Sequence, residues 1–265
     1  MTHKNKSCFL PAILLLTIVA LLAAVLTPRL INQSKVGQTL PTNPRDKEIA
    51  KLEAIMAEIK DKDSQEYKKA RRDFCLLTAR PETERAKAIA NIREFLHGIY
   101  PAVSKEFEPE FICSKFSSKP DNAGTDYNSP TVEFYEAENH SFEVDPKTNY
   151  ILGFGEAERR WGTKEDGTRW FEPTPEYDYS GIYTKPEELR QVAERFLTEH
   201  KSILDIDLAK MTYEYEGAKS GNFFLKWKTV DENGKAEELV SVTITNGGQI
   251  IVYNNDTYDL TKNGR

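Results

Sequence analysis

One segment of the sequence dictates an antiparallel hairpin: Val240-Ser241-Val242-Thr243-Ile244-Thr245-Asn246-Gly247-Gly248-Gln249-Ile250-Ile251-Val252-Tyr253. Its first half alternates apolar and polar residues, as a half-buried strand does, and Asn-Gly-Gly is turn chemistry. Residues 141–154 follow the same plan, with Asp145-Pro146-Lys147-Thr148-Asn149 in place of the glycine turn, and each hairpin ends in an aromatic residue. A helical pattern with a Phe-Leu pair precedes each hairpin, Phe95-Leu96 in the first case and Phe196-Leu197 in the second. The repetition predicts two copies of one structural unit.

Each copy is predicted to be one helix packed on a small antiparallel sheet. The helices are expected to begin at Pro81-Glu82 and at Pro186-Glu187, because acidic residues suit the positive end of the helix dipole. Alternating segments that follow, such as residues 131–136 and 222–228, are typical of strands. A helix followed by several strands indicates the α+β class rather than alternating α/β.

The predicted organisation places a helical segment and a transmembrane helix before the two α+β units. The expected segments are a cytoplasmic stub with the transmembrane helix (1–28), a tether (29–44), the helical segment (45–80), the first unit (81–156), an aromatic connector (157–184) and the second unit (185–260).

The N-terminal region carries an uncharged, mostly apolar run over residues 8–26. At the rise of an α-helix such a run spans about 30 Å, the thickness of the hydrocarbon core of a bilayer. Lys4 and Lys6 precede it, which favours an N-terminus inside and the bulk of the chain outside the cytoplasm. A cleaved signal peptide is the alternative, but its apolar part is shorter and Leu26-Thr27-Pro28-Arg29 is a poor cleavage site. We therefore expect a single-pass protein of the cell membrane.

The helical segment shows an apolar stripe formed by Ile49, Leu52, Met56 and Ile59. Ser64 is placed to cap a second helix. The stripe fills two heptads, so one hypothesis is a short coiled coil that pairs two chains. Packing of the helix on its own domain is the favoured alternative.

The chain has 265 residues, of which 39% are hydrophobic, and a net charge of −6. An acidic surface repels nucleic acid and anionic lipid headgroups, so neither is expected as a partner. The hydrophobic share is low although it includes the apolar run, which predicts small units with thin cores.

Two cysteines, Cys75 and Cys113, fall in the part of the chain expected outside the cytoplasm, where a disulfide persists. The setting Phe74-Cys75-Leu76-Leu77 is apolar, and it favours a buried core residue over a disulfide-bonded one.

Catalytic signatures are absent from the sequence, so no catalytic, cofactor-binding or metal-binding residue is predicted. His97 and His200 fall near the ends of the two repeat helices, where a cation suits the negative end of the dipole. Paired carboxylates such as Glu156 and Glu158 are typical of a solvated acidic face. A hydrolase that uses these carboxylates remains an alternative function.

The connector is rich in the residue types that dominate binding hot spots. Its candidate partner-binding residues are Trp161, Trp170, Tyr177 and Tyr179. The alternative is that the large aromatics of the connector cover the sheet or hold the two copies together.

The second copy, with its Phe-Leu helix and the pattern Val-x-Val-x-Ile-x-x-Gly-Gly-x-Ile-Ile-Val-Tyr, resembles a PepSY-type, peptidase-associated domain. The first copy resembles it less closely because its turn lacks glycine. The resemblance implies a membrane-anchored, non-catalytic module that binds or restrains a peptidase or an envelope enzyme outside the cytoplasm. A structural envelope protein that forms a homodimer through residues 45–79 is the alternative.

Overall fold

The computed structural model describes residues 43–101, 106–118, 125–157, 161–163, 169–171, 176–230, 234 and 236–256. The chain divides into two compact units, residues 1–47 and 48–265, and only residues 43–47 of the first are described. The predicted membrane span and nearly all of the tether lie outside the described residues. No helix within the described ranges has the length and apolar character needed to cross a bilayer.

The described elements include the helices and hairpins that the repeat predicts, with two helices ahead of the first copy, whereas the β5–β6 pair, α6 and η1 were not predicted. They are α2 (Pro44–Glu58), α3 (Gln65–Thr78), α4 (Glu82–Ile99), β1 (Glu110–Ser118), β2 (Thr125–Ala137), β3 (His140–Val144), β4 (Ile151–Glu156), β5 (Trp161–Thr163), β6 (Arg169–Phe171), α5 (Pro186–Glu199), α6 (Lys201–Leu204), η1 (Leu208–Lys210), β7 (Thr212–Lys219), β8 (Asn222–Val230), β9 (Ala236–Thr245) and β10 (Ile250–Asn255).

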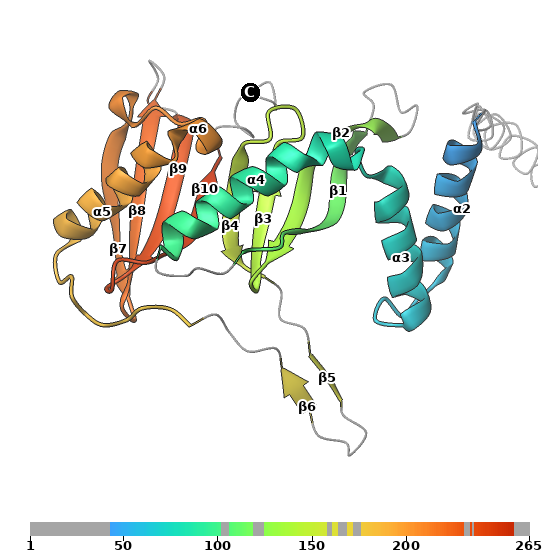
Figure 1. Ribbon diagram of the computed structural model, residues 1–265, viewed down its shortest axis with the longest axis horizontal. Coiled ribbons are helices and arrows are strands. Elements are labelled where there is room, and N and C mark those ends of the chain that lie inside the picture. Colours follow the sequence, from blue (N-terminus) through green and yellow to red (C-terminus); the bar gives the residue numbers. More distant parts are fainter. Residues whose placement is uncertain are drawn as a thin grey trace, which may run out of the picture. The chain divides into compact units, whose positions relative to one another are not determined.

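Within the described ranges, one eight-stranded antiparallel sheet runs in the order β1-β2-β3-β4-β10-β9-β8-β7 (Figure 1). Its first four strands come from the first copy and its last four from the second. The copies join where β4 pairs with β10, with Phe154 opposite Tyr253. These two residues are the aromatics that end the repeated hairpins. The predicted α+β class is confirmed, and the two predicted sheets form one continuous sheet.

Both repeat helices, α4 and α5, lie on the same face of this sheet (Figure 1). Phe95 of α4 contacts Phe196 of α5 and Tyr253 of β10, with ring centroids 5.1 and 6.0 Å apart respectively. Buried residues of the two copies belong to a single hydrophobic cluster. The expectation of two thin cores was therefore wrong, because the joined sheet lets both helices bury their apolar faces together.

The turns of the two repeated hairpins each contain a residue with a positive φ, but the residue type differs between them. Asn149 ends the β3–β4 turn with φ +63°, and Gly248 occupies the β9–β10 turn with φ +86°. Asparagine tolerates the left-handed region better than other non-glycine residues do. Asp145 supports its turn by accepting a hydrogen bond from the Lys147 amide at 3.1 Å. The first copy thus keeps the hairpin without the glycine.

Helix α3 is fastened to the outer strand of the first copy. Ser64 caps α3 as predicted, since its Oγ accepts a hydrogen bond from the Tyr67 amide at 3.2 Å. Cys75 of α3 forms a disulfide with Cys113 of β1. The interpretation of Cys75 as an unbonded core residue was therefore wrong. Cys75 is buried, but α3 packs beside β1 and brings the two Cα atoms to 4.7 Å, which no local pattern determines.

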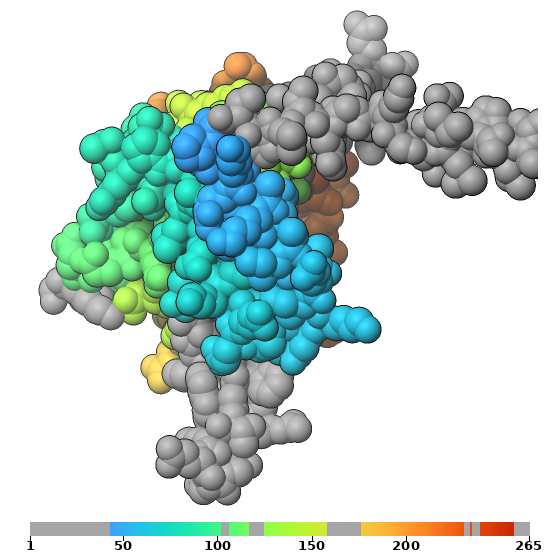
Figure 2. All heavy atoms as spheres, turned by 90° about the vertical axis from the view of Figure 1, so that its right-hand side faces the viewer, coloured from blue at the N-terminus to red at the C-terminus, as the bar shows by residue number. Residues whose placement is uncertain are grey.

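The apolar stripe of the helical segment packs against other residues of the same chain. Ile49 and Leu52 of α2 are buried, and Phe74 of α3 packs edge-on against Tyr127 of β2. Figure 2 views the protein from this side, with the described residues of α2 and α3 facing the viewer, and α3 contacts β1. Packing of the helices on their own domain, the favoured alternative, is confirmed for these residues.

A buried ion pair fixes the start of α4 to the first copy. Arg80, just before α4, binds Glu133 of β2 through two hydrogen bonds of 2.8 and 2.7 Å. Tyr135 donates to the same carboxylate at 2.8 Å, and Asn149 accepts from Arg80 at 3.0 Å. Glu133 is fully buried, so these partners supply the hydrogen bonds that water would otherwise provide.

Candidate functional site

The segment that leads into α5, residues 176–184, is called the strap below. The Tyr183 amide donates to the Asn246 carbonyl at 3.0 Å, and the Asp178 amide donates to Gln249 Oε1 at 2.7 Å. These bonds hold the strap against the β9–β10 turn. Gly247 and Gly248 permit the close approach, because a Cβ would lie 2.4 Å from the Asp178 carbonyl oxygen at the first and 2.6 Å from the Tyr183 ring at the second.

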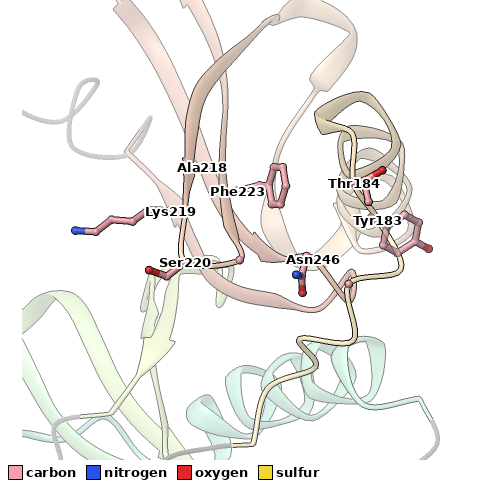
Figure 3. Close-up of a pocket in the computed structure, with 9 residues that line it drawn as sticks. Tyr183, Thr184, Ala218, Lys219, Ser220, Phe223 and Asn246 are labelled. Carbon is pink, nitrogen blue, oxygen red and sulfur yellow. The ribbon is translucent and has the colours of Figure 1, made fainter.

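Tyr183 of the strap stands between two hollows in the described surface, which we call hollow A and hollow B. Their volumes are about 350 Å³ and about 330 Å³, within the range of ligand-binding clefts. Hollow A lies between the strap and the β7–β8 hairpin (Figure 3). Hollow B lies between the strap and the first turns of α5. Besides Tyr183, hollow A is lined by Gly181, Thr184, Ala218, Lys219, Ser220, Gly221, Phe223 and Asn246, and hollow B by Ile182, Glu188, Gln191, Val192 and Arg195.

Large apolar side chains of the strap are unusually exposed. Tyr179 is 46% exposed and Ile182 is 69% exposed. Ile182 forms part of the rim of hollow B, and the Tyr179 ring lies beside Gly221 at hollow A. Exposed apolar groups gathered around hollows are typical of protein-binding surfaces rather than of ordinary solvated surface. We refer to Tyr179, Ile182, Tyr183 and hollow B as the strap surface.

The structure separates the four candidate residues of the connector. Tyr179 lies on the strap surface as described above. Tyr177 is half-buried, with its ring centroid 6.2 Å from that of His140 in the first copy. Trp161 and Trp170 belong to β5 and β6, which pair with Trp161 opposite Phe171 and Gly162 opposite Trp170. The side chains of these two tryptophans lie outside the described part of the structure.

Ile182 and Tyr183 are the residues of this surface that the sequence did not single out. They stand just before Pro186, where α5 begins, and an isolated Ile-Tyr pair next to a helix start has no distinctive pattern. The sequence feature that could have pointed to this segment is the glycine turn at residues 247–248, since two adjacent glycines indicate that another chain segment comes close.

The three histidines in the described part of the chain lie at helix ends or in the core. His97 lies in the last turn of α4, and the His200 Nδ1–H donates to the Phe196 carbonyl at 2.8 Å at the end of α5, so the predicted positions are confirmed. His140 is buried and stacks on Phe154 with centroids 4.9 Å apart. Burial lowers the pKa of His140. No cluster of three or more potential metal ligands occurs among the described residues.

The carboxylates considered for catalysis do not form part of the hollows. Glu156 is an exposed residue at the end of β4 and lines neither hollow A nor hollow B. Glu158 lies outside the described residues.

Comparisons with protein-family models and with curated proteins give no match. Among solved structures, the chain is similar to the Bacillus megaterium YpeB C-terminal domain, with 11% sequence identity and a TM-score of 0.39. The match covers 66% of this chain, which spans 63% of the length of that one. The likeness concerns the backbone arrangement alone.

Proposed function

We propose that this protein is a membrane-anchored, non-catalytic module that binds a protein partner outside the cytoplasm. In this proposal the apolar run of residues 8–26 is the anchor, the N-terminus is inside, and the two copies are tandem PepSY-type units. The partner expected from the PepSY resemblance is a peptidase or another envelope enzyme, which the module restrains or recruits.

The observation that carries the proposal is the strap surface. Ile182 is highly exposed beside a hollow of about 330 Å³, and two backbone amides of the strap that presents it donate hydrogen bonds to the β9–β10 turn. A preorganised apolar surface loses little conformational entropy on binding. Arg195 and Gln191 at the rim of hollow B add hydrogen-bond donors, as is common around binding hot spots.

Two further observations support the location and the binding role. The Cys75–Cys113 disulfide suits an oxidising compartment outside the cytoplasm. The apolar residues Ile49 and Leu52 are buried within the chain, which favours the binding module over a structural protein that dimerises through residues 45–79.

The proposal is tested by replacing Ile182 with serine in the full-length protein in its own membranes. Capture of the partner is expected to fall at least about tenfold, because the exposed anchor of the surface is lost. Val230→Ser is the matched control, since Val230 is a β-branched aliphatic residue that is 51% exposed at the end of β8. Equal capture by both variants would show that the strap surface is not the binding site.

A further inference from the structure

The two edges of the eight-stranded sheet differ in what lies beside them. At the first margin, β1 is accompanied by α3, which a disulfide fastens to it. At the other margin, β7 pairs with β8 on one side and no described strand pairs with it on the other. Most β7 residues are exposed. An open strand margin exposes unpaired backbone groups that favour pairing with another strand.

The side chains of β7 divide between the two faces of the sheet. Glu214 forms an ion pair with Lys228 on the face away from the helices, and Lys219 lies on that same face, pointing away from the strap in Figure 3. Tyr215 and Ala218 lie on the helix-bearing face, since their partners across β8 are Leu225 and Phe223 of the core side. Tyr215 is 40% exposed, and Ala218 lines hollow A.

Two copies of β7 are complementary to each other in one antiparallel register. When Glu214 stands opposite Lys219 of a second copy, Tyr215 stands opposite Ala218 of that copy. Residues opposite one another in an antiparallel pair point to the same face, and this register satisfies that condition across the bulge between Tyr215 and Gly217. Lys219 makes no ion pair within the described part of the chain and is available for the contact.

The competing register is unfavourable. With Tyr215 opposite itself, Glu214 would face Glu216 of the second copy twice, and like charges directly opposite each other are destabilising. The self-complementary register places two opposite-charge pairs on one face. On the other face it puts each Tyr215 opposite Ala218 of the other copy, which lines hollow A, and the hollow's volume of about 350 Å³ accommodates an aromatic side chain.

We propose that β7 is the contact strand of a two-fold symmetric dimer, in which it pairs antiparallel with β7 of a second copy and each Tyr215 enters hollow A of the other. The contact is isologous, so it closes as a dimer and leaves no further open margin at β7. Hollow B and Ile182 lie on the other side of Tyr183 and stay available to a different protein.

The test uses charge reversal in the full-length chain, with the oligomeric state measured by sedimentation in detergent. Glu214→Lys and Lys219→Glu each turn two attractive pairs into two repulsive ones, so each variant alone is expected to dimerise at least about tenfold more weakly. An equimolar mixture of the two variants restores both pairs in a heterodimer and is expected to dimerise as the unchanged protein does.

Lys115→Glu, a charge reversal on β1 at the opposite margin, is the matched control and is expected to have no effect. Thermal unfolding of each variant establishes that the fold is retained. Four results would overturn the proposal: a monomeric unchanged protein, single variants that dimerise normally, a mixture that stays monomeric, or binding of another protein's strand to β7.

Discussion

Phe95 and Phe196 occupy equivalent places in the two copies, and their rings pack edge to face with centroids 5.1 Å apart. Phe154 and Tyr253, the residues that end the two hairpins, likewise stand opposite each other across the β4–β10 pairing. Contacts between equivalent residues are what an internal two-fold relationship generates. The two copies therefore meet through the same surfaces, and their stabilities are expected to be coupled.

The first prediction concerns Phe95→Ala. Phe95 is fully buried and contacts rings from both copies, so its truncation is expected to lower the free energy of unfolding by about 3–5 kcal/mol. Denaturant titration followed by both tryptophan fluorescence and circular dichroism is expected to show a single transition. The half-exposed Phe116 of β1 is the control, and its replacement by alanine is expected to cost less. Two separate transitions would mean that the copies unfold independently.

The second prediction concerns Gly98→Ala in α4. In a helix this substitution ordinarily stabilises by about 1 kcal/mol. At Gly98 the added Cβ would lie 2.3 Å from His200 Nε2 and 2.9 Å from the Phe196 ring, so a loss of about 1–3 kcal/mol is expected instead. Gly155→Ala in β4 is the comparison, because beyond its own residue and its two chain neighbours no heavy atom lies within 4 Å of its Cβ position. A gain in melting temperature for Gly98→Ala would refute the close approach of α4 and α5.

The third prediction concerns the Cys75–Cys113 disulfide. It closes a loop with a sequence separation of 38 residues, for which chain entropy gives about 4 kcal/mol of stabilisation. Cys75→Ser is expected to lose that amount in denaturant titration under oxidising conditions. A reducing agent is expected to destabilise the unchanged protein but to have no further effect on Cys75→Ser. If the reductant shifts both proteins equally, the bond does not exist in solution.

The fourth prediction concerns pH. Burial lowers the pKa of His140 below its ordinary value of 6.5, although Glu138 and Glu156 act in the opposite sense. The stability that depends on neutral His140 is therefore fully present above pH 6.5 and is lost as the pH falls below it. Between pH 7 and about pH 5 the unchanged protein is expected to lose more stability than His140→Phe, which keeps a ring next to Phe154. Parallel pH profiles would contradict a buried, neutral His140.

The sequence predicted what depends on local periodicity. The Phe-Leu helices, the hairpins ending at Phe154 and Tyr253, and the Ser64 cap follow from spacing and turn chemistry, and the structure contains them. The joining of β4 to β10 and the bond between Cys75 and Cys113 were not predictable in this way. Both depend on which elements pack side by side, and residues distant in sequence carry no local signal of that choice.

The candidate site was predicted only in part for the same reason. Composition drew attention to Tyr179, because aromatic residues in a connector are conspicuous. Ile182 becomes significant only when the strap is seen against the start of α5, because these two segments form hollow B. Exposure is a property of the folded chain, and an isolated isoleucine in the sequence does not reveal it.

The central claim is that the strap surface holds a protein partner, and site-specific photo-crosslinking tests it most directly. A photoreactive amino acid is placed at Ile182 or, as the control, at Val230 in the full-length protein in its own membranes. The claim predicts a specific crosslink from Ile182 to a different protein, identified as a peptidase or envelope enzyme, and none from Val230. Crosslinks of equal yield from both positions, or from neither, would contradict it.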